Sequence, residues 1–255
     1  MRFPAGPSLL SVCLASALWE ATTMALPLQP ALWPNPANLA PDGMEFFEGD
    51  MLFPGNRSED RAVVPGTYQL WPQGIIPVVI HPNLAHGVPL IRQAVASIQA
   101  KSCLRFVSRT TQRDYVHIFP GRGCYSAVGR QGSQQQLSLG TGCLNKGTVV
   151  HELLHAAGFF HEHSRSDRDQ YIVVFRQNVV PEYAFNFEKM QPWQHRLLTP
   201  FDKDSIMLYG SYAGSRAPGL YTMLARDGSR LREVPDKPGL SDSDARRIRI
   251  LYQCP

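Results

Sequence analysis

Residues 151–161 read HELLHAAGFFH, and this stretch decides the fold of the chain. On a helix with about 3.6 residues per turn, His151 and His155 stand one turn apart on one face, so both imidazoles can reach a single metal ion. Gly158 can adopt a left-handed backbone conformation that ends the helix and turns the chain. That turn brings His161 back as a third ligand. The spacing therefore predicts a metal site with three histidine ligands.

Glu152 stands directly beside the first of these histidines. Three neutral imidazoles leave one position of a tetrahedral zinc site open to water, as in catalytic rather than structural zinc sites. Zinc lowers the pKa of such a water toward about 7, and a nearby carboxylate can take its proton as the water attacks a carbonyl. Glu152 is the predicted general base, and as general acid it returns the proton to the leaving amine.

An alternative interpretation of residues 151–161 is a helix whose histidines face the core. A bare His-Glu-x-x-His pattern leaves that alternative open, but a glycine and a third histidine at fixed offsets make it much less favoured. The remaining histidines have no such spacing, and no role is predicted for them: His81, His86, His117, His163 and His195.

The composition is that of a globular protein, with 44% hydrophobic and 18% charged residues in a chain of 255. The formal net charge is +4, but the Lys and Arg residues are scattered along the chain. Segments that bind nucleic acid or anionic membranes carry runs of about five or more like charges. We therefore expect neither nucleic acid nor membrane insertion.

The N-terminus has the pattern of a secretory signal. A charged start at Arg2 precedes an apolar stretch over residues 9–19, which is shorter than the roughly 20 residues needed to cross a bilayer. Ala17 and Ala25 are alternative ends of this signal, and the sequence does not choose between them. The residues that follow, up to Arg61, are rich in Pro and show little periodicity, which favours a loosely structured propeptide. We expect a secreted protein.

The cysteines agree with an oxidising compartment. Five are present, and Cys13 lies inside the predicted signal. The exported product therefore keeps an even set of four, which allows three pairings. The residues alone leave these three pairings open.

Periodicity predicts three helices and part of a sheet. The helices are expected over residues 89–101, 146–157 and 241–252, the last one starting at a Ser with an acid three residues on. Short β-rich runs cover residues 75–81, 103–108 and 115–119. They favour a twisted sheet that packs on the first helix.

Two motifs carry a resemblance to a known family. Residues 151–171 read HELLHAAGFFHEHSRSDRDQY, and residues 205–209 read SIMLY. Both resemble the astacin family of zinc endopeptidases, which belongs to the metzincin clan. The resemblance implies an α+β fold with two lobes: a twisted N-terminal sheet with two helices, and a mostly irregular C-terminal lobe that ends in a helix. It also implies one Zn²⁺ per subunit and hydrolysis of internal peptide bonds in extracellular proteins.

The resemblance assigns further residues of the site. Met207, in the family's Met-turn, would form an apolar floor beneath the zinc. Tyr209 would be a fifth zinc ligand in the resting enzyme and would swing away to hydrogen-bond the developing oxyanion. Glu162 would pair with the freed N-terminus of the processed enzyme. Leu208 departs from the family pattern, where His is common, and little effect on the zinc is expected.

The resemblance also identifies a self-inhibited precursor. Residues 47–50, FEGD, are similar to a propeptide signature in which Asp50 occupies the position of the water on zinc. Cleavage after Arg61 by a trypsin-like protease would place the mature N-terminus at Ala62. The expected organisation is a signal over residues 1–25, with its end between 17 and 25, an inhibitory propeptide over 26–61 and a catalytic domain over 62–255.

The family's two disulfides imply bridges between Cys103 and Cys254 and between Cys124 and Cys143. Arg226 lies where several relatives place a basic residue that faces the side chain after the scissile bond, and a cation there would favour Asp or Glu. A solvated Arg226 is the alternative interpretation.

We expect a monomer that acts on protein or peptide substrates. Asn56-Arg57-Ser58 matches a glycosylation sequon, a pattern too common to carry weight alone.

Two functions from other classes were weighed against a peptidase. A catalytically inert zinc-binding module would have lost its Glu or a ligand, whereas Glu152 and all three histidines are present. A structural or toxin-like interaction protein is the other alternative. The residues do not distinguish digestion, egg-envelope breakdown, matrix remodelling and venom action, because one catalytic domain serves all of them.

Overall fold

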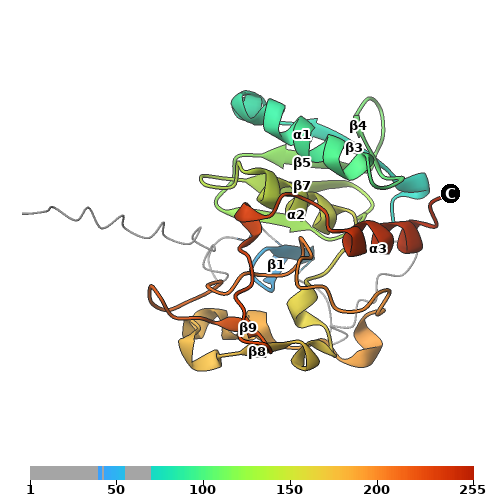
Figure 1. The fold of residues 1–255 in the computed structure, drawn as a ribbon. Helices are drawn as coiled ribbons and strands as arrows, with labels where there is room; N and C mark the ends of the chain where they lie inside the picture. The colour runs from blue at the N-terminus through green and yellow to red at the C-terminus, as the bar shows by residue number, and fades with distance from the viewer. Residues whose placement is uncertain (1–39, 42, 55–69) are drawn as a thin grey trace, which may run out of the picture.

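The computed structural model describes residues 40–41, 43–54 and 70–255. Its main feature is a seven-stranded sheet in the order β1-β2-β6-β7-β5-β3-β4 (Figure 1). The strands are β1 (Met44–Phe47), β2 (Met51–Pro54), β3 (Ile75–Ile80), β4 (Arg105–Ser108), β5 (Tyr115–Phe119), β6 (Cys124–Ala127) and β7 (Gln134–Leu139). Strands β4, β3, β5 and β7 run parallel, and β6 runs antiparallel to β7. Strand β2 pairs in parallel with β6, at the side of the sheet that lies nearest to the second lobe.

Helices α1 (Val88–Gln99) and α2 (Lys146–Ala156) contact each other and share one hydrophobic core with the sheet. Helix α1 buries Ile91, Ala94 and Ile98, the stripe expected from its periodicity. Helix α2 is different, because every residue from Gly147 to Ala156 is buried. A helix buried on all sides must find partners inside the protein for any polar side chain that it carries. This requirement falls on the histidines of α2 and on Glu152.

Gly147 shows why the first turn of α2 needs a glycine. A Cβ atom at this position would lie 2.0 Å from the Val234 carbonyl oxygen, which is a severe clash with backbone. The close approach brings the short helical turn Val234–Asp236 directly against α2. A segment far away in the sequence is thereby held beside the helix that carries two of the predicted ligands.

The second lobe contains little regular structure. It holds a two-stranded antiparallel sheet of β8 (Ile172–Val174) and β9 (Met223–Ala225), several short 3₁₀ turns and its own buried cluster around Phe187. Helix α3 (Asp242–Tyr252) follows, and its Ser241 and Asp244 form a reciprocal capping box. In Figure 1 the part with β8 and β9 lies below the large sheet, and β1 lies at the edge of the sheet that faces it.

The expected α+β class is confirmed, and all three predicted helices are found within two residues of their expected ends. The expectation of a loosely structured propeptide is wrong for residues 44–54, which form the hairpin β1–β2. The physical reason is that this hairpin extends an existing sheet, so its strands are paired and buried by the rest of the protein rather than by their own sequence. Strands β6 and β7 were also missed, because the polar run Gln134-Gln135-Gln136 hides the alternation of β7.

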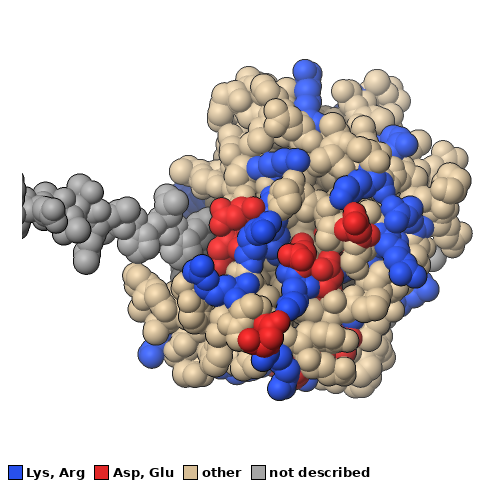
Figure 2. Space-filling view, viewed as in Figure 1, with Lys and Arg blue, Asp and Glu red and all other residues tan. Residues whose placement is uncertain are grey.

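Surface properties agree with the composition. On the face shown in Figure 2, Lys and Arg side chains lie among Asp and Glu side chains and form no large patch of one sign. Among the described residues, no helix combines the length and the apolar character that crossing a membrane requires.

Two disulfides close loops of very different length. Cys103 is bonded to Cys254 over a sequence separation of 151, and Cys124 to Cys143 over a separation of 19. This is the pairing that the family resemblance implies. The long bridge ties the end of α3 to the segment between α1 and β4, and the short one joins β6 to the loop before α2.

The length of the loop that each disulfide closes sets its expected contribution to the free energy of unfolding. In the chain-entropy model, opening the bridge to Cys254 should lower the free energy of unfolding by about 5 kcal/mol, and opening the bridge to Cys143 by about 3 kcal/mol. Two variants, each with both cysteines of one bridge replaced by serine, can be compared by urea unfolding followed by circular dichroism. A larger loss in the Cys124→Ser, Cys143→Ser variant would contradict this order.

Candidate metal centre and active site

Three histidine side chains meet at one buried point. The Nε2 atoms of His151, His155 and His161 lie 3.0, 3.1 and 3.2 Å from one another. All three side chains are almost inaccessible to solvent. The first two come from successive turns of α2, and Gly158 with φ +99° turns the chain so that the third can return. The structure therefore brings the three predicted ligands together.

The orientation of the two helical imidazoles is set by backbone carbonyls. His151 Nδ1 lies 2.8 Å from the Ile206 oxygen, and His155 Nδ1 lies 2.7 Å from the Phe159 oxygen. A carbonyl oxygen only accepts, so each Nδ1 carries the hydrogen and donates it. The Nε2 atom of each ring is then left with a free lone pair. Such fixation of the tautomer is usual for histidines that bind a metal.

The third imidazole has a carboxylate partner instead. His161 Nδ1 lies 2.7 Å from Glu48 Oε2, and Glu48 is 1% exposed. Glu48 has φ +49°, a left-handed conformation that is uncommon for a residue other than glycine. Its own carbonyl accepts a hydrogen bond of 2.6 Å from the Tyr209 hydroxyl. Residue 48 thus contacts the site through both its side chain and its backbone.

The donor set fits a zinc ion. Zinc bound at about 2.0–2.1 Å by tetrahedral imidazoles separates their nitrogens by roughly 3.3 Å, close to the spacing of the three Nε2 atoms. Lone pairs of neutral imidazoles that face one another this closely repel unless a cation lies between them. The residues present therefore fit the metal that the motif predicts.

Asp50 completes the group of possible ligands. Its Oδ1 lies 3.1 Å from His161 Nε2 and 3.5 Å from His155 Nε2, and its Oδ2 lies 3.3 Å from His151 Nε2. Oδ1 is buried and has no hydrogen-bond partner among the described residues. Burial opposes ionisation of this carboxyl, but its electrostatic interaction with His161 holds its pKa well below the usual range. An ionised oxygen without a donor, facing three imidazole nitrogens, has the chemistry of a metal ligand.

Tyr209 packs against the same group. Its hydroxyl donates to Asp50 Oδ2 at 3.0 Å, and its ring lies 4.3 Å from that of His161 and 4.2 Å from that of His163. Burial and the charge of Asp50 raise the pKa of Tyr209 well above its usual value. The hydroxyl is therefore a hydrogen-bond donor at neutral pH.

Glu152 is 1% exposed, and its Oε2 has no hydrogen-bond partner among the described residues. Burial, and then the charge of Asp50, raises the pKa of Glu152. A carboxylate held in such an environment is better suited to accept and return a proton than one in water. The position next to His151 on α2 keeps it at the metal centre.

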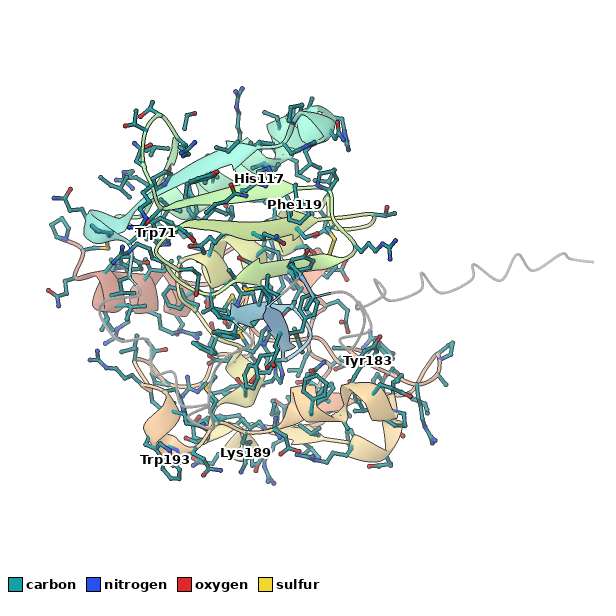
Figure 3. The ribbon with its side chains drawn as sticks, turned by 180° about the vertical axis from the view of Figure 1, so that it is seen from behind. Trp71, His117, Phe119, Tyr183, Lys189 and Trp193 are labelled. Carbon is teal, nitrogen blue, oxygen red and sulfur yellow. A yellow bond between two sulfur atoms is a disulfide. The ribbon has the colours of Figure 1, made fainter. Side chains whose placement is uncertain are left out.

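Two contributors to this site were missed by sequence reasoning. Glu48 lies inside the quoted FEGD signature, but an acid in a Pro-rich segment suggests solvent exposure. His163 was assigned no role, yet it is fully buried, its ring stacks on Tyr209, and its Nε2 lies 3.0 Å from the Asn186 oxygen. Neither residue has a spacing pattern that predicts it. By contrast, His117 lies away from the centre on β5, stacked on Phe119 at 5.6 Å (Figure 3).

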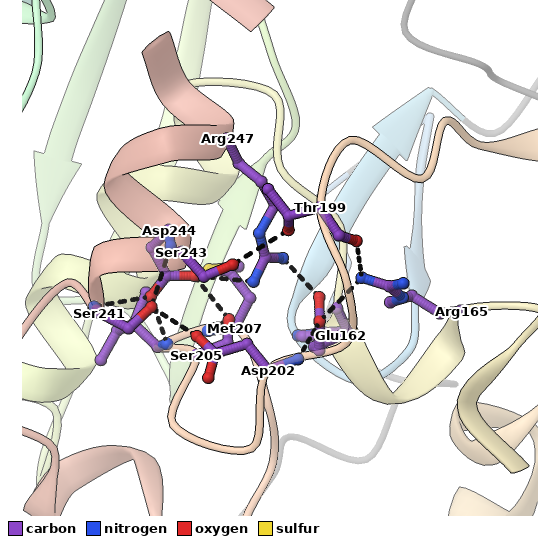
Figure 4. A network of polar contacts seen from close by, with 12 residues as sticks. Glu162, Arg165, Thr199, Asp202, Ser205, Met207, Ser241, Ser243, Asp244 and Arg247 are labelled. Carbon is purple, nitrogen blue, oxygen red and sulfur yellow. Dashed lines mark hydrogen bonds and ion pairs between the residues drawn. The ribbon is translucent and has the colours of Figure 1, made fainter. Parts of the chain in front are cut away.

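Glu162 is buried in a network of charges rather than exposed (Figure 4). Its Oε1 accepts from Arg165 Nη1 at 3.0 Å and from the Asp202 amide at 2.9 Å, and its Oε2 is paired with Arg247 of α3. A cavity of about 90 Å³ adjoins this carboxylate, and its wall includes Phe160. Buried charges need such partners because the loss of hydration is expensive.

Arg226 directly follows β9, and its Nε donates to the Asp169 carbonyl at 2.6 Å. It borders a groove of about 360 Å³ together with Arg168, Arg176 and Lys189. Asp169 also lines this groove and pairs with Arg168 and Lys189, while Arg176 pairs with Glu188. The assignment of Arg226 to substrate preference remains a prediction.

Comparisons with known proteins agree with this site. A family model described as Astacin, a peptidase family, matches residues 64–253. "Astacin-like metalloprotease toxin 1" from Loxosceles intermedia is 41% identical over 219 residues, which cover 84% of this chain and 83% of the toxin. High choriolytic enzyme 1 from Oryzias latipes is 37% identical over 215 residues, 82% of this chain and 78% of that protein.

A solved structure also matches. The structure of high choriolytic enzyme 1, a hatching enzyme zinc-protease from Oryzias latipes, aligns with a TM-score of 0.66 and 35% sequence identity. The alignment covers 78% of this chain and 98% of that one. The likeness therefore extends over almost all of the chain in that structure.

The ion pairs of Glu162 with Arg165 and Arg247 can be used to test whether these buried guanidinium groups need an anionic partner. Glu162→Gln leaves two buried guanidinium groups without their shared anion, so the free energy of unfolding should fall by about 3 kcal/mol. Urea unfolding measures this loss. Glu188→Gln is the matched control, because Glu188 and its partner Arg176 are 63% and 50% exposed, and such pairs contribute less than about 1 kcal/mol. Equal, small losses in both variants would show that the buried charge is not needed.

Proposed function

The chain belongs to the astacin family of peptidases and is a zinc metalloendopeptidase; on that premise we propose that it is a secreted enzyme, made as a self-inhibited precursor, that cuts internal peptide bonds of extracellular proteins. The observation that carries the proposal is the convergence of three buried Nε2 lone pairs, together with a buried Glu152 whose Oε2 has no hydrogen-bond partner in the described part of the chain. The apolar N-terminal stretch supports secretion, and the names of the relatives, a toxin and a hatching enzyme, describe proteins with extracellular action.

Each part of the chemistry has a residue of this chain assigned to it. His151, His155 and His161 would hold the zinc. When bound, zinc supplies Lewis acidity that polarises the scissile carbonyl and lowers the pKa of water toward about 7. Glu152 accepts the proton of the attacking water on its carboxylate and then donates it to the leaving amine nitrogen. Its burial raises its pKa, which makes the carboxylate a stronger proton acceptor.

Tyr209 supplies a hydrogen bond to the transition state in this proposal. Its hydroxyl is protonated, buried and aimed at the metal centre, where it donates to Asp50 and to the Glu48 carbonyl. Both acceptors belong to the β1–β2 hairpin, so removal of that hairpin also removes these two acceptors. A donor of this kind stabilises negative charge that develops on the carbonyl oxygen of the substrate.

The hairpin is proposed to be the inhibitory part of the precursor. Asp50 faces all three ligand nitrogens, Glu48 holds the third imidazole, and β2 occupies the edge of β6. A substrate would need these positions. The proposed organisation remains a signal over residues 1–25, a propeptide over 26–61 and a catalytic domain over 62–255. The signal, Asn56, Arg61 and Ala62 lie outside the described residues.

Activation is proposed to follow cleavage after Arg61 by a trypsin-like protease. The freed ammonium group of Ala62 would then approach Glu162 through the adjoining cavity, which is lined by apolar side chains such as Phe160 and by the carboxylate itself. In the precursor Glu162 is already paired with Arg165 and Arg247. The incoming ammonium group would therefore share this anion with two existing partners. The enzyme is proposed to be a monomer, and the family resemblance at Arg226 suggests an acidic preference after the cut.

Loss of the general base should abolish turnover without loss of metal. Glu152→Ala in the processed enzyme is expected to lower kcat by about 10²–10⁴-fold, while the zinc content measured by mass spectrometry stays at one per chain, because the histidines are unchanged. Glu182→Ala, at an exposed position of a 3₁₀ turn, is the control. Full activity of the Glu152→Ala enzyme would rule out the assigned role.

The inhibitory role of Asp50 can be tested in a chain that cannot be cut. In an Arg61→Gln background, Asp50→Ala should let the uncut precursor hydrolyse a fluorogenic peptide, because the carboxylate no longer covers the metal centre. Glu45→Ala, an exposed acid on β1, is the matched control and should stay silent. A precursor with Asp50→Ala that is as silent as its parent would argue against inhibition by this residue.

A further inference from the structure

Residues 205–209, the Met-turn, belong to no helix or strand. Ionised side chains from elsewhere in the chain form hydrogen bonds with several of their backbone N–H and C=O groups. The ammonium group of Lys237 donates to the carbonyl oxygen of Ser205 at 2.6 Å and also to that of Leu208. Lys237 is 3% exposed and comes from the loop after β9, about 30 residues further along the chain. Buried lysines are rare and need a structural or chemical reason.

The two carbonyls lie next to the two residues of the turn that contact the metal centre. The Ser205 carbonyl belongs to the same planar peptide unit as the Ile206 amide, and the Leu208 carbonyl shares one with the Tyr209 amide. The oxygen of Ile206 accepts the hydrogen bond from His151 Nδ1. One ammonium group therefore fixes the peptide planes that lead into the acceptor for the first zinc ligand and into Tyr209.

Asp244 binds the same turn (Figure 4). Its Oδ1 accepts from the Ser205 hydroxyl at 2.7 Å, and its Oδ2 accepts from the Ile206 amide at 2.8 Å. The carboxylate also caps α3 through Ser241. An anion and a cation thus hold the two ends of one peptide unit, because Asp244 accepts from the Ile206 amide and Lys237 donates to the Ser205 carbonyl.

The loop that carries Lys237 is itself held in place. The Val234 carbonyl lies so close to Gly147 of α2 that no side chain fits between them. Glu233 accepts from the Tyr212 amide at 2.9 Å, and its carboxylate fills the space beside Gly210. Lys237 is therefore anchored both to the helix of the first two ligands and to the segment that follows Tyr209.

The surroundings favour the charged amine despite its burial. Burial lowers the pKa of Lys237 to about 8, while the carboxylates of Asp244, Glu233, Asp202 and Asp204 act in the opposite direction. A methionine would fill a similar volume without a desolvation cost. What the amine adds is two strong hydrogen bonds to the carbonyls of the turn.

We propose that Lys237 is a positioning residue for peptide hydrolysis: it holds the Met-turn so that the Ile206 carbonyl orients His151 and the Tyr209 hydroxyl reaches the metal centre. The proposal rests on the proposed roles of the histidines and of Tyr209. Lys237 touches neither substrate nor ligand and acts through the peptide units next to them.

The test compares Lys237→Met with Lys237→Arg in the processed, zinc-loaded enzyme. Lys237→Met removes the donors, so kcat should fall by about tenfold with KM nearly unchanged, and zinc release to a chelator should become about tenfold faster, as found for residues that orient ligands. Lys237→Arg keeps the donors and should recover most of both properties. If Lys237→Met does not fold, Lys237→Gln, a shorter side chain that retains an N–H donor, gives the same comparison.

Two further variants separate this proposal from its premises. Lys203→Met is the matched control, because Lys203 is exposed and pairs with Asp227 on the surface. Tyr209→Phe should lower kcat on its own; if it does not, the role of the tyrosine fails, and only zinc release still tests Lys237. Wild-type kcat and wild-type zinc release in folded Lys237→Met, even with a lower melting temperature, would mean that the residue is merely structural and would overturn the proposal.

Discussion

The structure depends on the fixation of one nitrogen in each of three imidazole rings. Each Nδ1 atom is held by an acceptor, so that each Nε2 lone pair faces the same point. The acceptors are the carbonyls of Phe159 and Ile206 and, in the precursor, the carboxylate of Glu48. They come from the turn after α2, from the Met-turn and from the β1–β2 hairpin, which are far apart in the sequence. Much of the fold can be understood as the means by which these segments are brought to one buried position.

Burial of this centre makes the surrounding charges necessary. Helix α2 lies wholly inside the protein, and the turns around it lack the hydrogen bonds of regular structure. Their polar groups are instead satisfied by ionised side chains such as Asp244, Lys237 and Glu162. Each of these charges is costly alone and is stabilised by a partner of opposite sign or by several backbone groups. The site is consequently rigid, as a metal centre that positions a base and a hydrogen-bond donor must be.

The sequence predicted correctly those elements whose structure is determined by the local spacing of residues. An apolar stripe predicted the first helix, a capping pattern at Ser241 predicted the third, and the spacing of the three histidines predicted the convergence of their rings. The β1–β2 hairpin was not predicted, because its strands are stabilised by the edge of β6 rather than by their own pattern. Glu48 and Lys237 were missed for a related reason: an isolated charged residue suggests solvent exposure, and only the tertiary structure buries it. Arg226 shows the reverse case, in which a motif suggested a role that the local contacts leave open.

The central claim is that three imidazoles hold one catalytic zinc ion in this chain. Zinc K-edge X-ray absorption of the purified precursor, combined with its metal content, tests this most directly. The account predicts one zinc per chain, surrounded by three imidazole nitrogens and by oxygen, with no sulfur in the first coordination sphere. A chain purified without zinc, or a spectrum with sulfur or with fewer than three imidazoles, would contradict it.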